Sequence, residues 1–376
     1  MSLYLSLKKW QGKEDFSHDV YQGMQGCLAC KGCVSQCPIH VDIPSLKSLF
    51  LERYHSRYLR PFRDYFMANI EQLAYYQSFA PNIFNNVVQN SLSKLIISKS
   101  LNLVDPPLIS PLILRQKLTI ELKIETLQNL SREEQKNSII LLQDAFTSFY
   151  EAQLVVDTYH FFENLGYNVY LLPFFINGKP LHLKGFINQF KTVVKQNIKH
   201  LKKVLYLDIP LIGIEPSMTL TYRDEYDKIS DDENIFNKVK LIQEFLVEQD
   251  KVFPKIKQNK PYYLLGHCHE KSLVFNSQKQ WQTVFKNMGV RLNLVPVGCC
   301  GMAGMYGHER EHYESSQDIY RSSWQQHLPE NIEDRPYYLV TGYSCRSQVK
   351  RLSGWKPQYP IQVLNKLISG TKNNAS

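Results

Sequence analysis

The stretch CLACKGCVSQCP, residues 27–38, carries the strongest structural signal in this sequence of 376 residues. It places four cysteines at the spacing C-x2-C-x2-C-x3-C, namely Cys27, Cys30, Cys33 and Cys37. A cubane iron–sulfur cluster needs four thiolates that converge on a small object, and a short loop with cysteines three apart can wrap it. Gly26 and Gly32 let the backbone approach the inorganic sulfides closely. The spacing therefore predicts a 4Fe-4S cluster held by this loop.

The fourth cysteine of the run has two interpretations. In ferredoxins with two clusters and this same spacing, the fourth cysteine binds the other cluster. The sequence contains no second run, so either Cys37 completes a local cluster or a cysteine from elsewhere does. We expect Cys37 to complete it. A zinc ribbon would need two separated CxxC pairs. Lys31 lies inside the loop, and we expect its positive charge to favour the reduced cluster slightly.

The other four cysteines follow a long cysteine-free stretch, residues 38–267, and they are Cys268, Cys299, Cys300 and Cys345. A secreted disulfide framework is short and dense in cysteine, whereas this chain is neither. Thiols at these spacings must be brought together by the fold, and Gly298 and Gly301 flank the adjacent pair. We predict a metal site that holds a second cluster or zinc, with buried structural thiols as the plain alternative. His267 and His269 could add ligands.

Composition narrows the class of protein. Lysine and arginine number 44 against 35 aspartate and glutamate, a formal net charge of +9, but the basic residues form no block, so we expect no nucleic-acid binding. The 43% of apolar residues is typical of globular proteins, and the length predicts two or three domains. No apolar run approaches the ~18 residues of a membrane helix. The apolar segment at residues 3–5 is too short for a signal peptide. We therefore expect a cytoplasmic protein without a transmembrane segment, and attachment at the inner membrane face stays open.

The pattern of apolar residues changes along the chain. Helical spacing begins at Ser45, which is placed to cap the helix, and continues to about residue 100 with breaks at Pro61 and Pro81. Residues 104–111 hold three prolines and predict a linker. Beyond the linker, short apolar runs alternate with helical stretches, which is typical of α/β architecture. We expect helices at 152–164 and 279–288, and strands at 139–142, 167–172, 262–265 and 290–295.

The two α/β stretches match one another at a constant offset. Gly166 and Gly289 are 123 residues apart, and so are Gly178 and Gly301. Further on, Pro216-Ser217-Met218 stands opposite Tyr343-Ser344-Cys345 at an offset of 127 residues. We predict an internal duplication. Opposite the four downstream cysteines the first copy has no thiols, since the residues there are Ala145, Ile176, Asn177 and Met218.

A competing pattern is His308-Glu309-x-x-His312, the zincin signature, in which two histidines on one helix face bind zinc and the glutamate activates water. Only three positions of this pattern are fixed, so chance matches are common. We expect a solvated helix start after Gly307 instead. The sequence contains neither the glycine-rich dinucleotide fingerprint nor the P-loop pattern, so nothing here binds FAD or NAD by a recognisable motif.

The downstream cysteines, together with GCCGMAGMYGHE at 298–309, resemble the cysteine-rich CCG domain. This domain occurs in the iron–sulfur subunits of heterodisulfide reductase, glycolate oxidase and anaerobic glycerol-3-phosphate dehydrogenase, often in pairs behind a ferredoxin module. Because this stretch includes His308 and Glu309, the resemblance also explains the match to the zincin signature without a protease function. Some CCG domains end in CxxC, whereas Cys345 is followed by Arg346-Ser347-Gln348. A conventional cluster, a zinc ion and a vacant site therefore stay open.

Five longer stretches carry a narrower resemblance: CLACKGCVSQCPIHVDIPSLKS (27–48), YHSRYLRPFRDY (54–65), NGKPLHLKGF (177–186), EPSMTLTYRDEY (215–226) and TGYSCRSQVKR (341–351). They look like the C-terminal iron–sulfur part of FAD-linked D-2-hydroxyacid dehydrogenases of the D-2-hydroxyglutarate dehydrogenase type. Those enzymes carry a flavin domain, then one ferredoxin run and a CCG pair. The resemblance covers essentially the whole chain. The flavin domain of those enzymes has no counterpart in this sequence.

The patterns and the resemblance together predict an α/β fold. A helical ferredoxin-like N-terminal module precedes two tandem α/β CCG domains related by internal duplication. The expected boundaries are a ferredoxin-type 4Fe-4S module at 1–55, a helical linker region at 56–135, a degenerate CCG repeat lacking cysteines at 136–255, and a CCG repeat with cysteines at 256–376.

The resemblance implies an oxidoreductase component, the iron–sulfur electron-transfer module of an FAD-dependent dehydrogenase for D-2-hydroxyglutarate or a D-lactate-like acid. It would relay electrons from a flavin, held by a separate or missing FAD-binding domain, to a quinone or carrier. All eight cysteines are candidate metal ligands, and no catalytic residue is expected in this chain. A homo-oligomer stays open. The alternative is an assembly or binding module stabilised by zinc or a cluster, and the third hypothesis is an HExxH metalloprotease.

Overall fold

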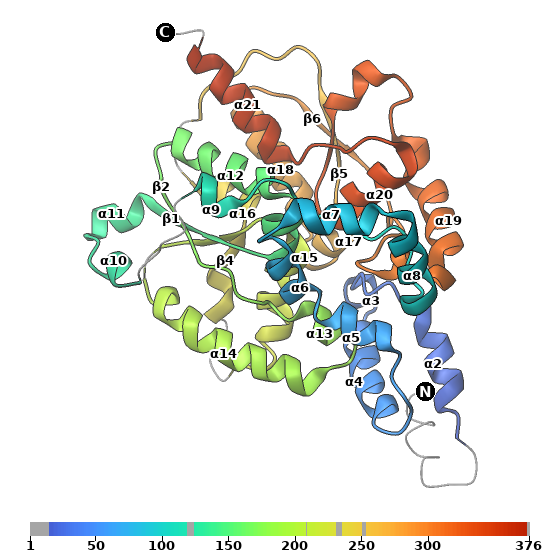
Figure 1. The fold of residues 1–376 in the computed structure, drawn as a ribbon. Helices are drawn as coiled ribbons and strands as arrows, with labels where there is room; N and C mark the ends of the chain where they lie inside the picture. The colour runs from blue at the N-terminus through green and yellow to red at the C-terminus, as the bar shows by residue number, and fades with distance from the viewer. Residues whose placement is uncertain (1–14, 119–123, 208, 231–234, 250–252, 374–376) are drawn as a thin grey trace.

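The computed structural model describes residues 15–118, 124–207, 209–230, 235–249 and 253–373, so the apolar segment at residues 3–5 lies outside it. The chain forms a helical N-terminal part and two parallel sheets with helices around them (Figure 1). The α/β class is therefore confirmed. Within the described residues, no helix combines the length and the apolar character needed to cross a bilayer.

The N-terminal part consists of α2 (Ser17–Gln25), α3 (Gly32–Gln36) and α4 (Ile43–His55). The helix α4 begins earlier than the sequence predicts. Asp42 is its N-cap, and the carboxylate of Asp42 accepts a hydrogen bond from the Ser45 backbone N–H at 3.0 Å. The prediction that Ser45 caps this helix is therefore wrong, because Pro44 fits the first turn, where no backbone N–H is needed.

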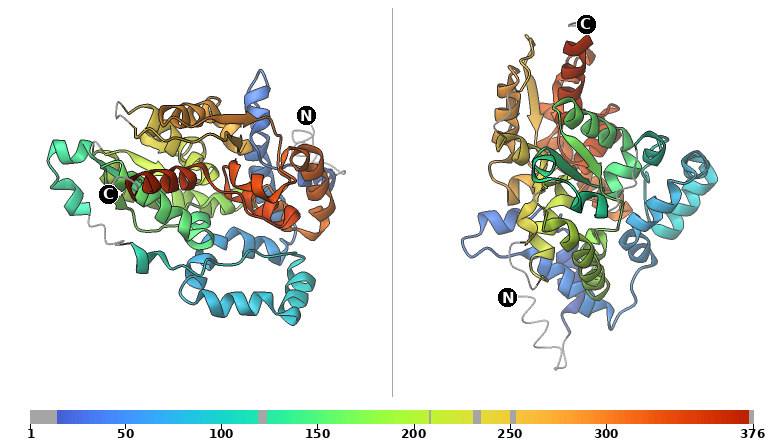
Figure 2. Two further views of the ribbon diagram at one scale, coloured as in Figure 1. Left: turned by 90° about the horizontal axis from the view of Figure 1, so that it is seen from above. Right: turned by 90° about the vertical axis from the view of Figure 1, so that its left-hand side faces the viewer.

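The region between residues 56 and 135 is helical, as expected, and its helices are α5 (Phe62–Ala68), α6 (Ile70–Gln77), α7 (Pro81–Gln89), α8 (Ser91–Leu101), α9 (Leu114–Lys117), α10 (Ile124–Gln128) and α11 (Arg132–Lys136). Pro61 is the N-cap of α5 and Pro81 is the first residue of α7, so both prolines mark helix starts. The helices α7 and α8 pack against each other at one side of the molecule (Figure 2). Residues 104–111 contain neither helix nor strand.

The first sheet has the strand order β2-β1-β3-β4, all parallel, with β1 (Ser138–Leu142), β2 (Asn168–Leu171), β3 (Leu211–Gly213) and β4 (Val239–Leu241). Around it lie η1 (Phe146–Tyr150), α12 (Ala152–Asn164), α13 (Lys179–Leu183), α14 (Ile187–Leu205), α15 (Pro216–Thr221), η2 (Tyr222–Tyr226), η3 (Ile235–Lys238) and α16 (Ile242–Val247). All five residues of β1 are buried. The expected strands at 139–142 and 167–172 and the helix at 152–164 are confirmed.

The second sheet has the order β6-β5-β7, again parallel, with β5 (Tyr262–Leu265), β6 (Leu292–Val295) and β7 (Tyr338–Val340). Its helices are α17 (Cys268–Leu273), α18 (Ser277–Asn287), η4 (Tyr306–His308), η5 (Arg310–His312), α19 (Tyr313–Ser323), η6 (Gln325–His327), η7 (Ile332–Tyr337), α20 (Tyr343–Ser353) and α21 (Pro360–Asn373). The predicted strands and helix of this half are also confirmed, with ends that differ by one or two residues.

The two sheets pair their strands in the same register. In the first sheet Ile139 lies opposite Val169. In the second sheet Tyr262 lies opposite Leu292, and both residue numbers are higher by 123. The strands β3 and β7 take the same place beside β1 and β5, at the offset of 127 residues. The glycines matched in the sequence also share a left-handed backbone: φ is +82° at Gly166 and +79° at Gly289.

The helices of the two units pack reciprocally. The helices α12 and α18 each follow the first strand of their sheet, and α16 and α21 end the two units. In the structure α12 packs on α21 and α16 packs on α18, so the last helix of each unit packs against a helix of the other unit. One apolar core therefore spans both units, with Phe162 and Phe245 from the first and Trp281 and Phe285 from the second.

Candidate metal centre

The N-terminal cysteine run folds into a tight loop in which one backbone N–H group is directed at a cysteine sulfur. Ala29 and Lys31 both have a positive φ, 52° and 61°, which is uncommon for residues with a side chain and marks a functional constraint. The backbone N–H of Gly32 hydrogen-bonds the Cys30 thiol. All eight cysteines are free thiols. A loop with free thiols and inward N–H groups fits the donor set that a 4Fe-4S cluster requires.

The thiols of the run have two different environments. Burial raises the pKa of the Cys30 thiol, and the neighbouring thiols of Cys299, Cys27 and Cys33 raise it further. The hydrogen bonds from backbone N–H groups of Val41, Ile39 and His40 instead lower the pKa of Cys37. Three thiols of the run thus lie together, whereas the fourth faces the turn that follows α3.

Lys31 is buried with only 1% of its side chain exposed, and three carboxylates surround it. Its Nζ lies 2.7 Å from Asp42, 2.7 Å from Asp224 and 3.4 Å from Glu225. Although burial alone would lower it, Glu225 and Asp224 raise the pKa of Lys31 above its usual value. Three carboxylates thus compensate the positive charge that we expect to favour the reduced cluster slightly, and that expectation stays a prediction. The lysine next to the loop backbone is Lys47, whose Nζ donates to the Cys27 carbonyl at 3.2 Å.

The four downstream cysteines follow the carboxyl ends of the parallel strands of the second sheet, where open α/β sheets gather ligands. Cys268 begins α17 after β5, Cys299 and Cys300 lie in the loop after β6, and Cys345 lies in the first turn of α20 after β7. Cys300 and Cys345 are buried in an apolar cluster with Trp324, whereas Cys268 and Cys299 are half-buried. The structure thus brings together four thiols that are far apart in the sequence.

Hydrogen bonds single out Cys299 within this group. The thiols of Cys268 and Cys300 both hydrogen-bond its sulfur, and the Gly301 N–H lies 3.4 Å from it. These bonds lower the pKa of Cys299 to about 3. The bonds to Cys299, with burial, raise the pKa of Cys268 and Cys300. The thiolate is the form that binds metal, so four thiols gathered in this way have the chemistry of a metal site.

Two histidines next to Cys268 are buried. Burial lowers the pKa of His267 to about 4, so this imidazole is neutral near pH 7. Its Nε2 lies 3.3 Å from the Ser344 hydroxyl. Within the described part of the chain, neither Nδ1 of His267 nor Nε2 of His269 has a hydrogen-bond partner. Neutral imidazoles with an unpartnered nitrogen leave metal ligation by these residues open.

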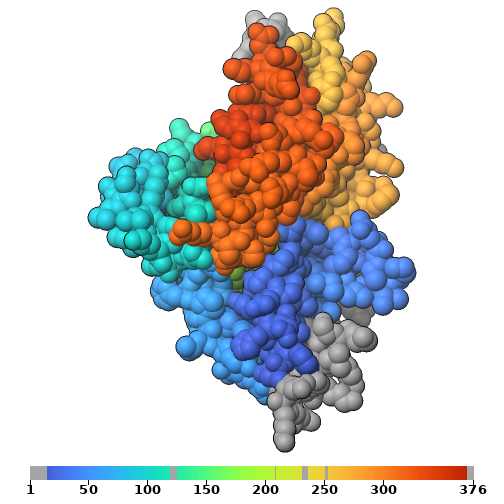
Figure 3. Space-filling model, turned by 90° about the vertical axis from the view of Figure 1, so that its right-hand side faces the viewer, coloured from blue at the N-terminus to red at the C-terminus, as the bar shows by residue number. Residues whose placement is uncertain are grey.

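A pocket of roughly 1310 Å³, counting its open mouth, lies between the N-terminal loop and the two α/β units. Its lining includes Cys27 and Cys30 from the loop, Met218 and Glu215 from the first unit, and Cys268 and Tyr343 from the second. Figure 3 shows the N-terminal part (blue) against the second unit (orange) on one face of the molecule. The loop therefore opens toward the downstream thiols rather than toward solvent alone.

Two of the four residues that stand in the first unit at the positions of the thiols, Asn177 and Met218, contact each other. The Asn177 Nδ2 donates a hydrogen bond to the Met218 carbonyl at 3.2 Å. Asn177 is buried, and its Oδ1 has no partner among the described residues. The carbonyl of Ile176, which precedes Asn177, accepts from the Asn197 amide at 2.7 Å, and Ala145 is the N-cap of η1 in a separate apolar cluster.

The zincin pattern does not fold as one helix. His308 ends the short helix η4, Glu309 is extended, and His312 ends η5 before α19 begins at Tyr313. The prediction of a solvated helix start is wrong, because His308 and Glu309 are buried. The Nδ1 of His308 lies 3.0 Å from the Val104 carbonyl, and Glu309 binds Lys184 at 2.6 Å. A backbone broken at Glu309 lacks the single helix face on which a zincin places both histidines.

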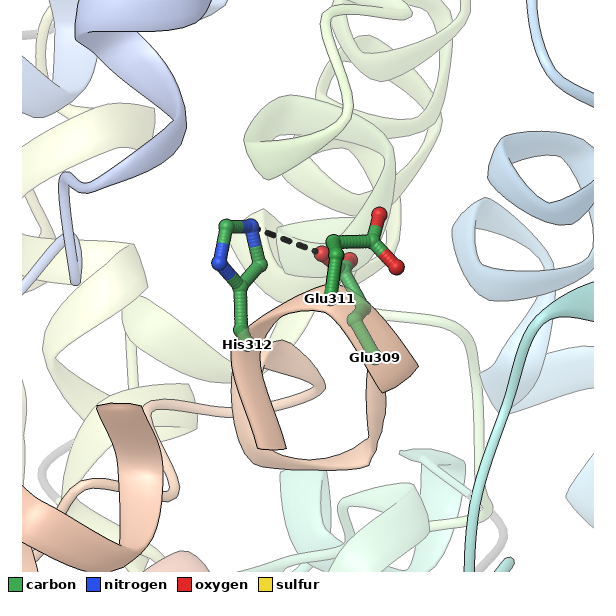
Figure 4. A group of neighbouring side chains, drawn as sticks. All are labelled: Glu309, Glu311 and His312. Carbon is green, nitrogen blue, oxygen red and sulfur yellow. Dashed lines mark ion pairs between the residues drawn. The ribbon is translucent and has the colours of Figure 1, made fainter. Parts of the chain in front are cut away.

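Ligand atoms of Glu309, Glu311 and His312 lie within 4.8 Å of one another (Figure 4). Each carboxylate already has cationic or hydrogen-bonding partners. Glu311 binds Arg63 and accepts from the Asn102 amide at 2.8 Å. His312 lies 3.6 Å from Glu309. This group is accordingly an ion-pair cluster that joins the second unit to the helical region.

Several residues of the site were not predicted from the sequence. Asp42, Asp224 and Glu225 surround Lys31, and Glu215 lines the pocket. All four acids lie within the stretches 27–48 and 215–226 that resemble a known family, but nothing in the spacing pointed to their partners. Only the fold brings them to the cluster loop.

The chain is similar to curated proteins over nearly its whole length. It is 40% identical over 364 residues to D-2-hydroxyglutarate dehydrogenase of Escherichia coli. The aligned stretch makes up 95% of this chain and 36% of that protein. With the protein of the same name from Pseudomonas putida it shares 41% identity over 360 residues, covering 94% and 35%. It thus spans about a third of the length of these relatives.

A more distant similarity concerns one subunit of the anaerobic glycerol-3-phosphate dehydrogenase of Escherichia coli. The identity is 23% over 246 residues, which amounts to 62% of this chain and 60% of the related one. No family model matches the sequence. No solved structure matches it either.

Proposed function

We propose that this chain is the iron–sulfur electron-transfer part of an FAD-linked D-2-hydroxyacid dehydrogenase. The observation that carries the proposal is the loop in which the thiols of Cys27, Cys30 and Cys33 gather, with a Gly32 N–H directed at the central one. The similarity to D-2-hydroxyglutarate dehydrogenases supports an oxidoreductase, and D-2-hydroxyglutarate or a D-lactate-like acid is the proposed substrate of the whole enzyme.

The residues of this chain would hold and tune a 4Fe-4S cluster. Such a cluster, when bound, takes up and releases single electrons, at a potential set by hydrogen bonds, burial and nearby charge. Cys27, Cys30, Cys33 and Cys37 are the proposed ligands from the loop. Lys31 fixes the loop to Asp42 and to the first α/β unit, and Lys47 is the nearby cation that favours the reduced state.

The proposed redox partner of this part is a flavin. The named relatives are almost three times as long as the matched stretch, so we assign the flavin to an FAD-binding domain or subunit in the part of such an enzyme that this chain does not match. The proposed relay runs from that flavin to a quinone or a protein carrier. A cytoplasmic location belongs to the proposal, and attachment at the inner membrane face and homo-oligomerisation stay open within it.

The duplication predicted from the sequence is part of this proposal. Residues 136–255 form the unit without thiols and residues 256–376 the CCG unit, behind the module at 1–55 and the helical region at 56–135. The equal strand registers support it, and so does the reciprocal packing of α12 with α21 and α16 with α18. A second pair of contacts between the units is also reciprocal. The η1 helix of the first unit contacts α20 of the second through the rings of Tyr150 and Tyr343, and α17 of the second unit, which matches η1, packs on α15 of the first, which matches α20.

A second candidate function rests on the downstream thiols. Because Cys268, Cys299, Cys300 and Cys345 hydrogen-bond one another in a chain, they could hold zinc or a second cluster that stabilises an assembly module without electron transfer. Metal analysis of anaerobically purified protein separates the two functions. About four irons with equivalent sulfide supports the relay, and zinc without iron supports the assembly module.

The proposal is tested by replacing the central thiol of the loop. We expect Cys30→Ser to abolish the visible iron–sulfur absorbance and to remove iron and sulfide, because this thiol lies between two other proposed ligands. The control is Gln36→Ala, an exposed change in the neighbouring helix α3, which should leave both unchanged. Normal iron content and absorbance in Cys30→Ser would refute the assignment.

A further inference from the structure

We propose that the pocket between the N-terminal loop and the two α/β units binds a quinone, as the electron acceptor of this module. The inference rests on the proposed function, because it needs the electrons that the loop would relay. The proposed function leaves two acceptors open, a quinone and a protein carrier. The pocket favours the quinone and gives it a binding site.

Methionine is concentrated in the lining of this pocket. The chain contains seven methionines, and four of them line the pocket. They come from three parts of the molecule, namely Met67 from α5, Met218 from α15, and Met302 and Met305 from the loop after β6. The unbranched and polarisable methionine side chain adapts its shape to a partner and contacts aromatic rings favourably. A lining of this kind suits a ligand with an apolar ring.

Aromatic rings from both units form another part of the lining. Phe146 and Tyr150 of η1 line the pocket together with Tyr343 of α20. The ring centroids of Phe146 and Tyr343 are 5.2 Å apart, and those of Tyr150 and Tyr343 are 5.6 Å apart. Phe146 and Tyr343 are half-buried, so part of each ring stays free to contact a ligand. A planar ligand gains about 0.5–1.5 kcal/mol from each such ring contact.

The charged residues of the lining argue against an acidic ligand. Lys184 Nζ lies 2.6 Å from Glu309 and 3.1 Å from Asp64, and Lys179 is paired with Glu225. Among the described residues that line the pocket, no lysine or arginine is therefore left to bind a carboxylate or a phosphate. The pocket thus suits a neutral molecule rather than a hydroxyacid or a nucleotide.

A few polar groups of the lining can hold a neutral ligand by its oxygens. His267 and His269 are buried, with 5% and 3% of their surface exposed. Nδ1 of His267 and Nε2 of His269 have no hydrogen-bond partner in the part of the chain that the structure describes. When the Ser344 hydroxyl donates to His267 Nε2, at 3.3 Å, the neutral imidazole carries its proton on Nδ1 and can donate it to a carbonyl oxygen. Apolar walls with a few hydrogen-bonding groups fit a quinone, which is flat, neutral and has two carbonyl oxygens.

The pocket also lies where an electron acceptor of this module must bind. Cys27 and Cys30 of the loop line it, so a bound ring would lie next to the proposed cluster ligands. A quinone bound there takes up two electrons and two protons and leaves as the quinol. The electrons originate from the flavin by way of the loop, and the protons come from water at the open mouth. A protein carrier would instead dock on an exposed face and would leave the pocket without a role.

The test measures binding of two neutral quinones, ubiquinone-1 and menadione, by equilibrium dialysis with the full chain purified without oxygen. We expect saturable binding of one molecule per chain for at least one quinone, and no binding of D-2-hydroxyglutarate, which carries two carboxylates. Phe146→Ala removes a ring of the lining, so the dissociation constant should rise about two- to tenfold. Phe174→Ala is the matched control, because Phe174 is also half-buried beside the same apolar cluster but does not line the pocket. This control should bind the quinone as the unaltered protein does.

The other outcomes overturn the inference. If neither quinone binds to protein that holds about four irons, the inference is wrong while the proposed function stands. Equal dissociation constants in Phe146→Ala and Phe174→Ala would place the quinone outside this pocket, and D-2-hydroxyglutarate that competes with the quinone would show an acidic ligand instead. If Phe146→Ala fails to fold by circular dichroism, Leu183→Trp replaces it, since Leu183 is a half-buried lining residue and a larger ring there should fill the pocket and weaken binding. Retained iron in Cys30→Ser would instead refute the proposed function itself.

Discussion

The sheet formed by β1, β2 and β3 and the sheet formed by β5, β6 and β7 are paired alike, but different side chains follow their strands. In each, three parallel strands pair in the same register, and their carboxyl ends face the N-terminal part of the chain. The second unit places thiols there. The first unit places Asp224 and Glu225 near the same loop, where both bind Lys31. The first unit, which has no cysteine, therefore still fixes the position of the N-terminal loop through Lys31.

Two positions of the second unit lie close together, and so do the two positions that match them in the first unit by the offsets of 123 and 127 residues. Cys300 and Cys345 hydrogen-bond each other in the second unit. At the matching positions of the first unit, the Asn177 amide donates to the Met218 carbonyl at 3.2 Å. Backbone positions that a parallel sheet brings together stay together after the side chains change, because the strand ends define them. At these positions the units thus differ in side chains while the strand ends match, although the first sheet has a fourth strand, β4, which has no counterpart among the described residues of the second sheet.

The largest expected effect comes from breaking the contact of the first unit with the loop. In Lys31→Met the buried Glu225 keeps only Lys179 as a cation, and the half-buried Asp42 and Asp224 keep only the half-exposed Lys228. Removing one partner of a buried ion pair costs about 3–5 kcal/mol when the remaining charge is left unpaired, and the second cations place the expected cost at the low end of that range. We expect a loss of unfolding free energy of this size in urea titrations, together with a loss of bound iron.

The control for this change is Lys228→Met in the same network. Lys228 also binds Asp42, at 2.9 Å, and Asp224, at 2.5 Å, but half of its side chain is exposed. An exposed ion pair contributes only about 0–1 kcal/mol. Equal losses of stability in the two variants would show that burial of Lys31 is not what attaches the loop to the first unit.

Local patterns predicted the framework of the fold, and contacts between distant segments had to come from the structure. Buried β-strands such as 139–142 are recognisable from their own apolar residues, and the glycines at 166 and 289 mark turns that only a residue without a side chain enters easily. The partners of Lys31 are not recognisable in this way, because Asp224 and Glu225 are far away in the sequence. The same holds for the packing of α17, which begins at Cys268, on α3, since spacing within a run says nothing about a helix brought by another unit.

A smaller effect compares matched glycines of the two units. Gly178 and Gly301 have nearly the same backbone, with φ of +85° and +83°. Alanine in either place meets the left-handed strain of about 1–2 kcal/mol. At Gly301 a Cβ would also lie 2.2 Å from the Ser316 carbonyl oxygen, whereas at Gly178 the nearest atom is a Phe190 ring carbon at 3.0 Å. Overpacking adds about 1–3 kcal/mol, so Gly301→Ala should cost more than Gly178→Ala in thermal unfolding. A larger loss in Gly178→Ala would contradict this ranking.

The smallest effect concerns a carboxyl group at the contact between the units. Glu215 of the first unit is buried, and its carboxylate accepts from the Tyr343 N–H of the second unit at 2.7 Å and from the Ser217 hydroxyl at 3.1 Å. Burial, with the nearby Asp144, raises the pKa of Glu215 to about 8. The folded protein then binds this proton more tightly than the unfolded chain does. The unfolding free energy should consequently fall as pH rises from the unfolded value near 4.5 to about 8.

The window from pH 6.5 to pH 8 avoids the opposite effect of His267 and His308, whose pKa values burial lowers to about 4 and which act only below the unfolded value near 6.5. Other groups still titrate in this window, such as Glu71 with a pKa raised by burial to about 7, so the carboxyl effect is read from the difference between the unaltered protein and a Glu215 variant. Glu215→Gln keeps an acceptor for Tyr343 and removes the titration. We expect urea unfolding of the unaltered protein to lose roughly 1–2 kcal/mol more across this window than the variant does. Glu314→Gln, a change at an exposed glutamate, is the control. Equal losses in Glu215→Gln and the unaltered protein would mean that Glu215 is ionised in the fold, and that the contact between the two units holds a charge rather than a proton.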